Sequence, residues 1–333
     1  MKKISSFFNL ARIYLSYSFK LSSSNRYPSR IWIESSSRCN LKCRFCVNKD
    51  LSPDMKGDMD LDLFKRIIDE ISGKVYDINL FHRGEPLLNR DIVPMVSYAA
   101  GRGIKTRIHT NATLLDKDLS RKLILAGLDL ISFSFDGYTK EEYEKNRSGA
   151  NFNESLGKIV DFLKVKSELR SKKPFTIIQV IAQKEKLSRR ETGRQRKIFL
   201  RNFKNLPLNK IVTRNPHNWG GLLELNKQDK ERKSGSKKSL CTFPWYSLTV
   251  FYDGRVFLCP QDFEGRICLG NLNNERLNDI FNGKIIKAIR DTFISGKIEN
   301  VIPCSNCDRV RRKTFLKVPL EYLGIFIKDR LRV

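Results

Sequence analysis

Three cysteines near the start of the chain are spaced for metal chemistry. Cys39, Cys43 and Cys46 form a C-x3-C-x2-C motif directly after a short apolar run at residues 31–34. Thiolates are soft ligands, and three of them on one loop suit a soft metal ion or an iron–sulfur cluster. A structural zinc site needs a fourth ligand, which the neighbouring sequence does not offer. Three thiolates leave one iron of a 4Fe–4S cluster open, and an open coordination position is where metal chemistry takes place.

A second group of cysteines lies in the last third of the chain. Cys241 and Cys259 frame a C-x12-G-x4-C motif, and Cys304 and Cys307 form a C-x2-C pair. Four cysteines grouped in this way are typical of a zinc ribbon or of an iron–sulfur cluster, and the residues alone favour neither. Four protein thiolates would saturate a cluster, which predicts electron transfer or a structural role rather than substrate binding. Cys268 lies outside both motifs, and we expect it to be a buried free thiol.

The elements that must position these cysteines alternate between strand and helix. Apolar runs bounded by turn residues predict strands at residues 31–34, 75–82, 104–109, 128–135, 175–182 and 209–214. Helical periodicity predicts helices between them at residues 60–72, 92–102, 117–126, 153–168 and 191–203. Repeated βα units favour a parallel sheet, so the expected fold is α/β, either a partial (β/α)6 TIM-like barrel or a doubly wound sheet. Both arrangements bind ligands at the C-terminal ends of the strands.

The pattern changes beyond residue 220, and we expect five segments along the chain. They are a basic amphipathic extension at 1–28, the barrel at 29–222, a polar linker at 223–240, a smaller module at 241–310 and a C-terminal helix at 311–333. In the smaller module, Asp253-Gly254 lies between two alternating runs and predicts a hairpin. We expect the apolar face of the N-terminal extension to pack on its own chain, although peripheral membrane contact stays open.

The cysteine triplet and the residues at successive strand ends resemble the radical S-adenosylmethionine (radical SAM) superfamily. The family signature C-x3-C-x-φ-C, with φ aromatic, is present with Phe45 as its aromatic residue. Further landmarks follow the second, third and fourth predicted strands in order: Arg83-Gly84-Glu85-Pro86, Thr110-Asn111, Ser134-Phe135-Asp136-Gly137 and Arg147. The resemblance covers residues 28–215. It implies the partial barrel, a 4Fe–4S cluster with one open iron, and SAM as cofactor.

The resemblance implies roles around the methionine and adenine ends of SAM. Glu85 takes the place of the Glu in the family's Gly-Gly-Glu motif and is expected to bind the methionine ammonium; the alternative is a surface carboxylate. Arg83 replaces the first Gly of that motif, and we expect Gly84 to keep the turn intact. Phe45 is expected to pack on the adenine, with ordinary core packing as the alternative.

Polar residues at the next two strand ends are expected to hold the rest of SAM. Ser134 and Asp136 lie where the family contacts the ribose and carboxylate, with a helix N-cap as the alternative for Asp136. Thr110 and Asn111 are expected to position the adenosyl or methionyl part, with turn capping as the alternative for Asn111. Arg147 is in a position often used for the SAM carboxylate, or it is a surface cation.

The second cysteine group resembles the SPASM/twitch auxiliary-cluster domain. The chain has no cysteine after Cys307, so the match is to the one-cluster twitch form. Beside a radical SAM core, this resemblance favours a second 4Fe–4S cluster over zinc. The family reaction is reductive cleavage of SAM to methionine and a 5′-deoxyadenosyl radical, which abstracts hydrogen from a substrate. It implies a flavodoxin- or ferredoxin-type electron donor.

Three functions stay open. The first is hydrogen abstraction from a small polyol, sugar or other metabolite, a dehydrogenation in which the auxiliary cluster accepts an electron. The second is modification of a peptide or protein side chain, although the 30 residues before the first predicted strand are too few for a peptide-recognition domain. The third is a basic, zinc-stabilised nucleic-acid-binding protein. Arg214, His217 and Trp219 are candidate base or substrate contacts between the two modules, with packing as the alternative.

The composition excludes a polytopic membrane protein, a collagen-like chain and a fully disordered chain. Lys and Arg number 63 against 36 Asp and Glu, a formal net charge of +27, with denser patches at residues 184–197 and 308–314. Because the cations are mostly scattered, a solvated surface is favoured over a nucleic-acid face. The apolar runs are far shorter than the ~18 residues of a membrane span, and no secretion signal is evident. We therefore expect a cytoplasmic protein.

Overall fold

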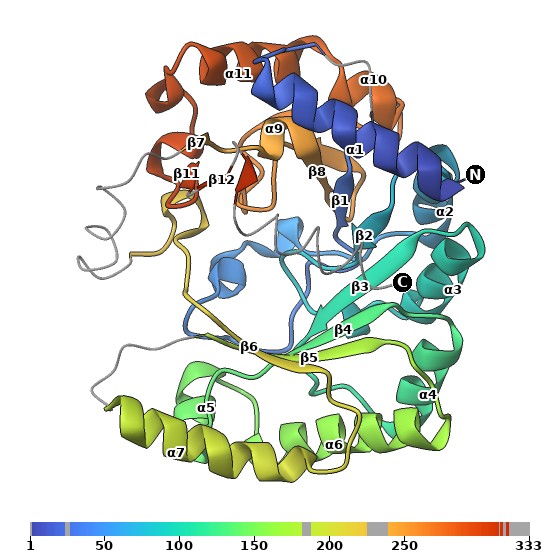
Figure 1. The fold of residues 1–333 in the computed structure, drawn as a ribbon, viewed down its shortest axis with the longest axis vertical. Coiled ribbons are helices and arrows are strands. Elements are labelled where there is room, and N and C mark those ends of the chain that lie inside the picture. The colour runs from blue at the N-terminus through green and yellow to red at the C-terminus, as the bar shows by residue number, and fades with distance from the viewer. Residues whose placement is uncertain are drawn as a thin grey trace.

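The computed structural model describes residues 2–23, 27–181, 188–224, 239–312, 314–315 and 318–319. A nine-stranded sheet in the order β10-β9-β8-β1-β2-β3-β4-β5-β6 forms its centre (Figure 1). Six neighbouring strands run parallel: β1 (Arg30–Ile33), β2 (Asp77–Asn79), β3 (Lys105–Thr110), β4 (Leu130–Ser134), β5 (Phe175–Ile181) and β6 (Lys210–Arg214). The predicted α/β fold with six parallel strands is confirmed.

Helices connect consecutive parallel strands and cover the outside of the sheet (Figure 1). The predicted ones are α2 (Leu61–Ile71), α3 (Ile92–Gly101), α4 (Lys117–Leu125), α6 (Phe152–Glu168) and α7 (Arg189–Leu200). A short helix, α5 (Lys140–Asn146), has no counterpart among the predictions, because its sequence KEEYEKN is polar apart from Tyr143. Hydrophobic periodicity needs at least two apolar positions on one face to signal a helix.

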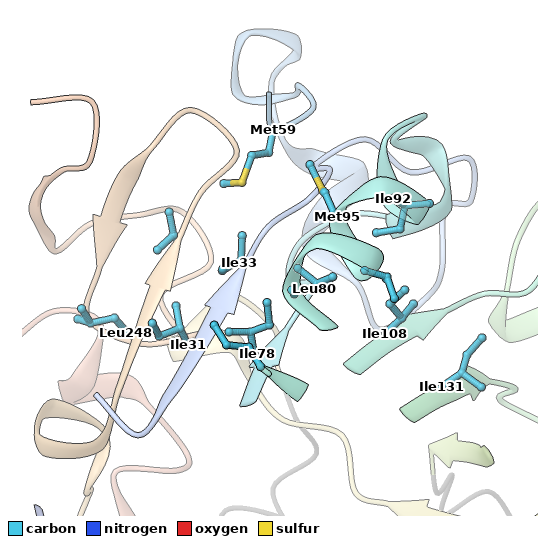
Figure 2. Packing of buried hydrophobic residues seen from close by; sticks show 14 of the residues in the cluster. Ile31, Ile33, Met59, Ile78, Leu80, Ile92, Met95, Ile108, Ile131 and Leu248 are labelled. Atoms are coloured by element: carbon cyan, nitrogen blue, oxygen red, sulfur yellow. The ribbon is translucent and has the colours of Figure 1, made fainter. Parts of the chain in front are cut away.

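Local sequence explains where α2 begins and which face it buries. The Asp60 side chain caps the helix by accepting hydrogen bonds from Asp62 N at 2.9 Å and Leu63 N at 3.0 Å. The buried side chains of α2 recur at helical spacing: Leu63, Phe64, Ile67, Ile68 and Ile71. Figure 2 shows the layer they join, in which isoleucines of β1, β2 and β3 lie beside Met95 of α3. Each fully buried aliphatic side chain stabilises the fold by ~1.5–3 kcal/mol.

The second cysteine-bearing module continues the same sheet. β8 (Ser247–Val250) pairs parallel with β1, which places Leu248 beside Ile31. β9 (Arg255–Phe257) and β10 (Cys268–Asn271) follow antiparallel, and the turn at Asp253-Gly254 confirms the predicted hairpin. All four residues of β8 are buried, as in a strand with neighbours on both sides. Short helices α9 (Phe243–Tyr246), α10 (Leu277–Phe281) and α11 (Lys284–Ile294) complete the module.

The N-terminal helix α1 (Lys2–Ser18) packs on this C-terminal module, as expected for the extension (Figure 1). Ile13 is buried, and the Tyr17 ring meets the Trp245 ring edge-on at 5.4 Å. Trp245 Nε1 donates a hydrogen bond to Leu21 O at 2.7 Å, and buried Arg290 donates to Ser22 O at 2.9 Å. None of the helices in the described part of the chain combines the length and apolar character needed to cross a membrane.

The C-terminal helix predicted at 311–333 is wrong over the part that the structure describes. β11 (Arg311–Arg312) pairs with β7 (Ser239–Leu240), and β12 (Thr314–Phe315) pairs with β13 (Val318–Pro319). The proline at the end of β13 lacks the N–H that a helix interior needs. The remainder of the predicted helix, 320–333, and most of the predicted linker, 225–238, lie outside the described residues.

Candidate functional site

The first cysteine group lies on the loop that follows β1. Cys39, Cys43 and Cys46 are half-buried, and burial raises the pKa of Cys39 to about 11 and that of Cys46 to about 12. The neighbouring thiols raise these pKa values further, which places the three sulfurs within electrostatic reach of one another. Burial also raises the pKa of Cys43. Three thiols on one loop, within electrostatic reach of one another, are the donor set of a metal cluster.

A close backbone approach fixes the loop before Cys39 against the turn after β2. Glu85 N donates a hydrogen bond to Arg38 O at 2.7 Å. A Cβ atom on Gly84 would lie 2.3 Å from Arg38 O, so only glycine fits here. Asn48 Nδ2 joins the same two segments by donating to the carbonyl oxygens of Ser37 and of the residue before Gly84, at 2.7 and 2.8 Å. The predicted turn at Gly84 is therefore intact.

Glu85 is a buried carboxylate that links two strand ends, which excludes the surface alternative. Its Oε1 accepts hydrogen bonds from Leu87 N at 3.1 Å and Thr110 Oγ1 at 2.7 Å, and its Oε2 accepts from Asn111 N at 2.7 Å. Burial raises the pKa of Glu85, although these three donors oppose the shift. Since a carboxylate has about four acceptor positions, three of them are already used by the protein.

Asn111 both caps a turn and reaches the cysteine loop. Its Oδ1 accepts from Thr113 N at 2.9 Å, and its Nδ2 donates to Asn40 Oδ1 at 2.9 Å. Asn40 directly follows Cys39. The turn-capping alternative is therefore observed, and the same side chain ties the end of β3 to the loop that carries the cysteines.

Asp136 and Arg147 form a buried ion pair beside the cysteine loop. Arg147 Nη2 lies 2.8 Å from Asp136 Oδ2, and Asp136 Oδ1 accepts from Ile181 N at 3.0 Å. Arg147 Nη1 lies 3.9 Å from Cys43 Sγ. Burial alone would lower the pKa of Arg147, but the charges of Asp136 and Cys43 outweigh it and raise the pKa. Arg147 is thus no surface cation, and Asp136 is no N-cap, since Thr139 caps α5.

The Arg147 side chain keeps one unused donor. Its Nε is buried and has no hydrogen-bond partner among the described residues. A buried donor without a partner costs ~1–3 kcal/mol, more when charged, unless a ligand satisfies it. An anionic group bound beside Cys43, such as a carboxylate, would do so. Ser134 and Phe45, also expected around SAM, are half-buried at the end of β4 and on the cysteine loop.

The second cysteine group is brought together from three separate segments. Cys241, Cys259 and Cys304 are buried and Cys307 is half-buried. Burial, and then the neighbouring thiols, raise the pKa values of Cys259 and Cys304. Four thiols within electrostatic reach of one another are the donor set of an iron–sulfur cluster or of zinc.

Cys268 is not a member of either group. It lies on β10 and is exposed, so the prediction that it is buried is wrong. β10 pairs with β9 at the end of the nine-stranded sheet, which leaves its side chain on the surface. Its Sγ lies 3.6 Å from Gly270 O.

The segment after β6 joins the two cysteine loops. Trp219 Nε1 donates to Phe45 O at 3.3 Å, and its ring meets Phe263 edge-on at 5.0 Å. Asn218 Nδ2 donates to Asn306 O at 2.7 Å, on the turn between Cys304 and Cys307. Residues 218–219 therefore contact both loops; for Trp219 this is the packing alternative, whereas the contact of Asn218 was not predicted.

His217 and Arg214, the two residues expected to act on the substrate, have different surroundings. The His217 ring is half-buried and lies 4.3 Å from the Trp219 ring, centroid to centroid. Arg214 ends β6 and is exposed. The structure thus places His217 against Trp219 and Arg214 at the edge of the sheet.

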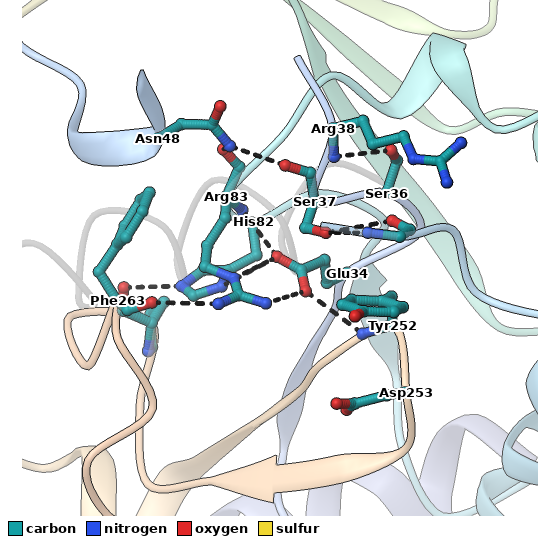
Figure 3. Close-up of polar contacts among 12 residues, drawn as sticks. Glu34, Ser36, Ser37, Arg38, Asn48, His82, Arg83, Tyr252, Asp253 and Phe263 are labelled. Carbon is teal, nitrogen blue, oxygen red and sulfur yellow. Dashed lines mark hydrogen bonds and ion pairs between the residues drawn. The ribbon is translucent and has the colours of Figure 1, made fainter. Parts of the chain in front are cut away.

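A buried ion pair that the sequence analysis misses ties the core to the second module (Figure 3). Arg83 Nε and Nη2 lie 2.7 and 2.8 Å from the two oxygens of Glu34, and Tyr252 N donates to Glu34 Oε2 at 3.2 Å. Burial would raise the pKa of Glu34, but the hydrogen bonds and charges of Arg83 and His82 together outweigh it and lower the pKa to about 2. The Arg83 guanidinium also lies 3.6 Å from the centre of the Phe251 ring. His82 Nε2 lies 2.9 Å from Pro260 O, next to Cys259.

Comparison with known families agrees with this arrangement. Residues 33–168 match the radical SAM superfamily, and residues 241–308 match the SPASM iron–sulfur cluster-binding domain. The protein is a radical SAM enzyme with a SPASM domain. These two domains imply a 4Fe–4S cluster, an auxiliary iron–sulfur cluster and SAM.

Individual relatives share parts of this chain. It is 30% identical over 158 residues to the tungsten-containing aldehyde ferredoxin oxidoreductase cofactor-modifying protein of Pyrococcus furiosus, over 46% of this chain and 44% of the relative. It is 30% identical over 119 residues to the PqqA peptide cyclase of Granulibacter bethesdensis, over 35% of this chain and 32% of the relative. The chain thus spans less than half the length of these curated relatives. The structure of BtrN in complex with AdoMet and 2-DOIA is similar in fold, with a TM-score of 0.57 and 19% identity, over 86% of this chain and 94% of BtrN.

Proposed function

We propose that the enzyme oxidises its substrate by hydrogen abstraction, and that the substrate lies between the two cysteine loops. The observation that carries this proposal is the junction segment, in which residues 218–219 contact the loop of Cys46 and the turn between Cys304 and Cys307. A substrate bound there would lie within reach of both cysteine loops. The site opens at the C-terminal ends of the parallel strands, where ligands of such sheets bind.

The two cysteine groups would hold the two clusters. Cys39, Cys43 and Cys46 would hold the radical SAM cluster and leave one iron for SAM, and Cys241, Cys259, Cys304 and Cys307 would saturate the auxiliary cluster. When bound, the first cluster supplies the electron that cleaves SAM to methionine and a 5′-deoxyadenosyl radical, and the second accepts one electron from the substrate. A flavodoxin- or ferredoxin-type protein would supply the first electron.

The chain's own residues would orient SAM. Arg147 offers its unused Nε donor to the SAM carboxylate, and Asp136 holds the guanidinium in place by the 2.8 Å ion pair. In this proposal Asp136 acts through Arg147 rather than by binding ribose alone. Glu85 acts mainly by joining the ends of β2 and β3, so that the backbone at Gly84 stays against the cysteine loop.

Other side chains at the strand ends would shape the rest of the SAM site. Phe45 packs on the adenine, because its half-buried ring stands beside Cys46. Ser134 faces the ribose from the end of β4, and Thr110 and Asn111 hold the turn that borders Asn40.

The oxidation needs a base as well as an electron acceptor. Loss of a hydrogen atom leaves a substrate radical; a proton and an electron must then leave it to complete a two-electron oxidation. We propose that His217, which lies against Trp219 at the junction, accepts this proton from the substrate. Arg214, exposed at the end of β6, would contact the substrate outside the reacting centre.

Two substrate classes have support. The likeness to BtrN, bound to 2-DOIA, favours a small metabolite such as a polyol or sugar. The sequence relationship to PqqA peptide cyclase favours a peptide. The third alternative, a zinc-stabilised nucleic-acid-binding protein, is not favoured, because residues 241–308 match an iron–sulfur cluster-binding domain.

Anaerobic reconstitution tests the proposed reaction. The protein is loaded with iron and sulfide, supplied with SAM and dithionite, and screened with metabolite and peptide fractions for those that increase 5′-deoxyadenosine. We expect the active fraction to yield a product two mass units lighter than its substrate. A product of unchanged mass, formed in stoichiometry with 5′-deoxyadenosine, would contradict an oxidation.

A further inference from the structure

The outer edge of β6 carries backbone groups that have no partner among the described residues. β6 ends the nine-stranded sheet and pairs with β5 on one side, and no strand lies beyond it within the described residues. Asn209 N donates to Thr176 O, toward β5. Since N–H groups alternate in direction along a strand, the N–H and C=O groups of Lys210, Val212 and Arg214 point away from β5. These groups can pair with an added strand.

The segment that leads into β6 is strongly cationic. Residues 188–214 contain nine Lys or Arg residues and one Glu. Its exposed cations include Arg190, Arg196, Lys197, Arg201, Lys204, Lys210 and Arg214. The one Glu, Glu191, pairs with Arg194 at 2.7 Å. The denser patch noted in the sequence thus continues along α7 to the edge strand.

α7 is anchored so that its cations face outward. Phe199 is buried, and its ring lies 5.2 Å from the Phe135 ring, whereas Arg196 and Lys197 are exposed. Figure 1 shows α7 at the end of the molecule opposite α1 and α11, with β6 between α7 and the middle of the molecule. A chain lying along β6 would therefore run past a positive surface.

Edge strands often carry a lysine only to prevent aggregation. That role requires one or two charges on the strand, and here exposed cations also line the preceding helix and turn. The middle residues of β6, Ile211 and Val212, are apolar and only half-buried. The strand also ends at residue 214, four residues before the segment that contacts both cysteine loops.

We propose that the outer edge of β6 docks an extended acidic peptide segment as an additional strand, with the cations of α7 binding its carboxylates. Backbone pairing requires a polypeptide, and the positive charge selects an acidic one. Nucleic acid and lipid offer no backbone amides for a strand edge. The proposal rests on the proposed function and names a peptide as its substrate class, since the docked chain would lead into the junction.

Binding of a defined peptide tests this directly. A fluorescein-labelled ten-residue Glu-Val repeat is titrated with the reconstituted full-length protein, and anisotropy is followed at low and at physiological salt. We expect binding that weakens about tenfold as the Debye length shortens. The Arg196→Glu/Lys197→Glu variant should bind about tenfold more weakly. The matched control Lys284→Glu/Lys297→Glu makes the same charge change at exposed sites of the opposite module and should bind like wild type.

A second peptide separates strand pairing from simple charge attraction. A Glu-Val repeat of the same length and charge with every backbone nitrogen methylated cannot enter a β-ladder, because neither of its edges offers an N–H. We expect it not to bind measurably. Equal binding of both repeats, or equal effects of the two charge variants, would overturn the proposal. The proposal would also be overturned if oligo-dT or anionic phosphatidylserine vesicles bound more tightly than the Glu-Val repeat, competed with it, and bound more weakly to the α7 variant. Because no assay here needs SAM or reductant, failure of docking is distinguishable from failure of the proposed oxidation.

Discussion

Arg83 binds Glu34 through two hydrogen bonds of 2.7 and 2.8 Å, with both side chains fully buried. Glu34 follows β1 of the core, and its second oxygen also accepts from Tyr252 N of the C-terminal module. The residue that replaces the first Gly of the family motif therefore connects the radical SAM core to the SPASM domain. Removing one partner of a buried pair leaves an uncompensated charge.

Replacing Arg83 by glycine, the residue of the family motif, should destabilise this protein. We expect Arg83→Gly to lower the free energy of unfolding by ~3–5 kcal/mol. Arg255→Ala, which breaks the exposed pair of Arg255 with Asp253, should cost only ~0–1 kcal/mol. Urea unfolding of the two variants and wild type measures both values. Equal losses in the two variants would contradict the assigned role of Arg83.

The same pair predicts how stability depends on pH. The pKa of Glu34 is lowered from its ordinary 4.5 to about 2 in the folded protein. The stability that this shift contributes is present above pH 4.5 and is lost as the pH falls toward 2. Arg83→Gly should lose less additional stability over that interval than wild type does. Parallel losses in the two proteins would show that Glu34 does not titrate as proposed.

Gly84 should tolerate no side chain. An added Cβ would lie 2.3 Å from Arg38 O, so Gly84→Ala must displace the loop that leads to Cys39. We expect at least about tenfold weaker SAM binding, ~1.4 kcal/mol, measured by calorimetry on the reconstituted enzyme. Gly101→Ala is the control, because nothing lies within 4 Å of its added Cβ. Gly101→Ala should leave the affinity for SAM unchanged. If Gly84→Ala also leaves it unchanged, the turn at Gly84 does not position the SAM site.

The Asp136–Arg147 pair should matter for SAM binding, beyond the loss of stability that breaking a buried ion pair brings. Arg147→Met removes the unused Nε donor, and we expect it to weaken SAM binding by ~1.5–3 kcal/mol, a roughly tenfold to hundredfold loss. Asp136→Asn should show a smaller loss, since it only loosens the guanidinium. Asp118→Asn, at an exposed pair with Lys122, is the control. A larger loss in Asp136→Asn than in Arg147→Met would favour direct ribose binding by Asp136.

The iron content of cysteine variants should show that the two cysteine groups hold separate clusters and that Cys268 is not a cluster ligand. Two 4Fe–4S clusters give about eight irons per chain, and the Cys39→Ala/Cys43→Ala/Cys46→Ala variant should retain about half of them. Exposed Cys268 lies outside both groups, so Cys268→Ser should keep all of the iron and the same reduced-state EPR signals. Iron loss in Cys268→Ser would show that the ligand set is assigned wrongly.

Elements with strong periodicity were predictable, and contacts between distant segments were not. The helical spacing of the apolar residues in α2 and the N-cap Asp60 predict that helix, whereas α5 has Tyr143 as its single apolar residue. The pairing of β8 with β1 joins residues more than 200 positions apart, and nothing local signals it. Likewise, Arg83 is visible in the sequence as a departure from the motif, but its partner Glu34 lies 49 residues away. The spacing within the C-x3-C-x2-C and C-x2-C motifs is a local property and was visible in the sequence, whereas the approach of Cys241 and Cys259 to Cys304 joins three separate segments.

Substrate-free cleavage of SAM tests the central assignment most directly. The auxiliary cluster has no open iron in this account, so it should not be needed to cleave SAM. With dithionite and SAM, the Cys304→Ala/Cys307→Ala variant should still form 5′-deoxyadenosine slowly, whereas Cys39→Ala should form none. Circular dichroism and SAM affinity of the same samples establish that each variant is folded, because metal binding couples to folding. Folded Cys304→Ala/Cys307→Ala protein that cannot cleave SAM, or Cys39→Ala protein that still can, would contradict the account.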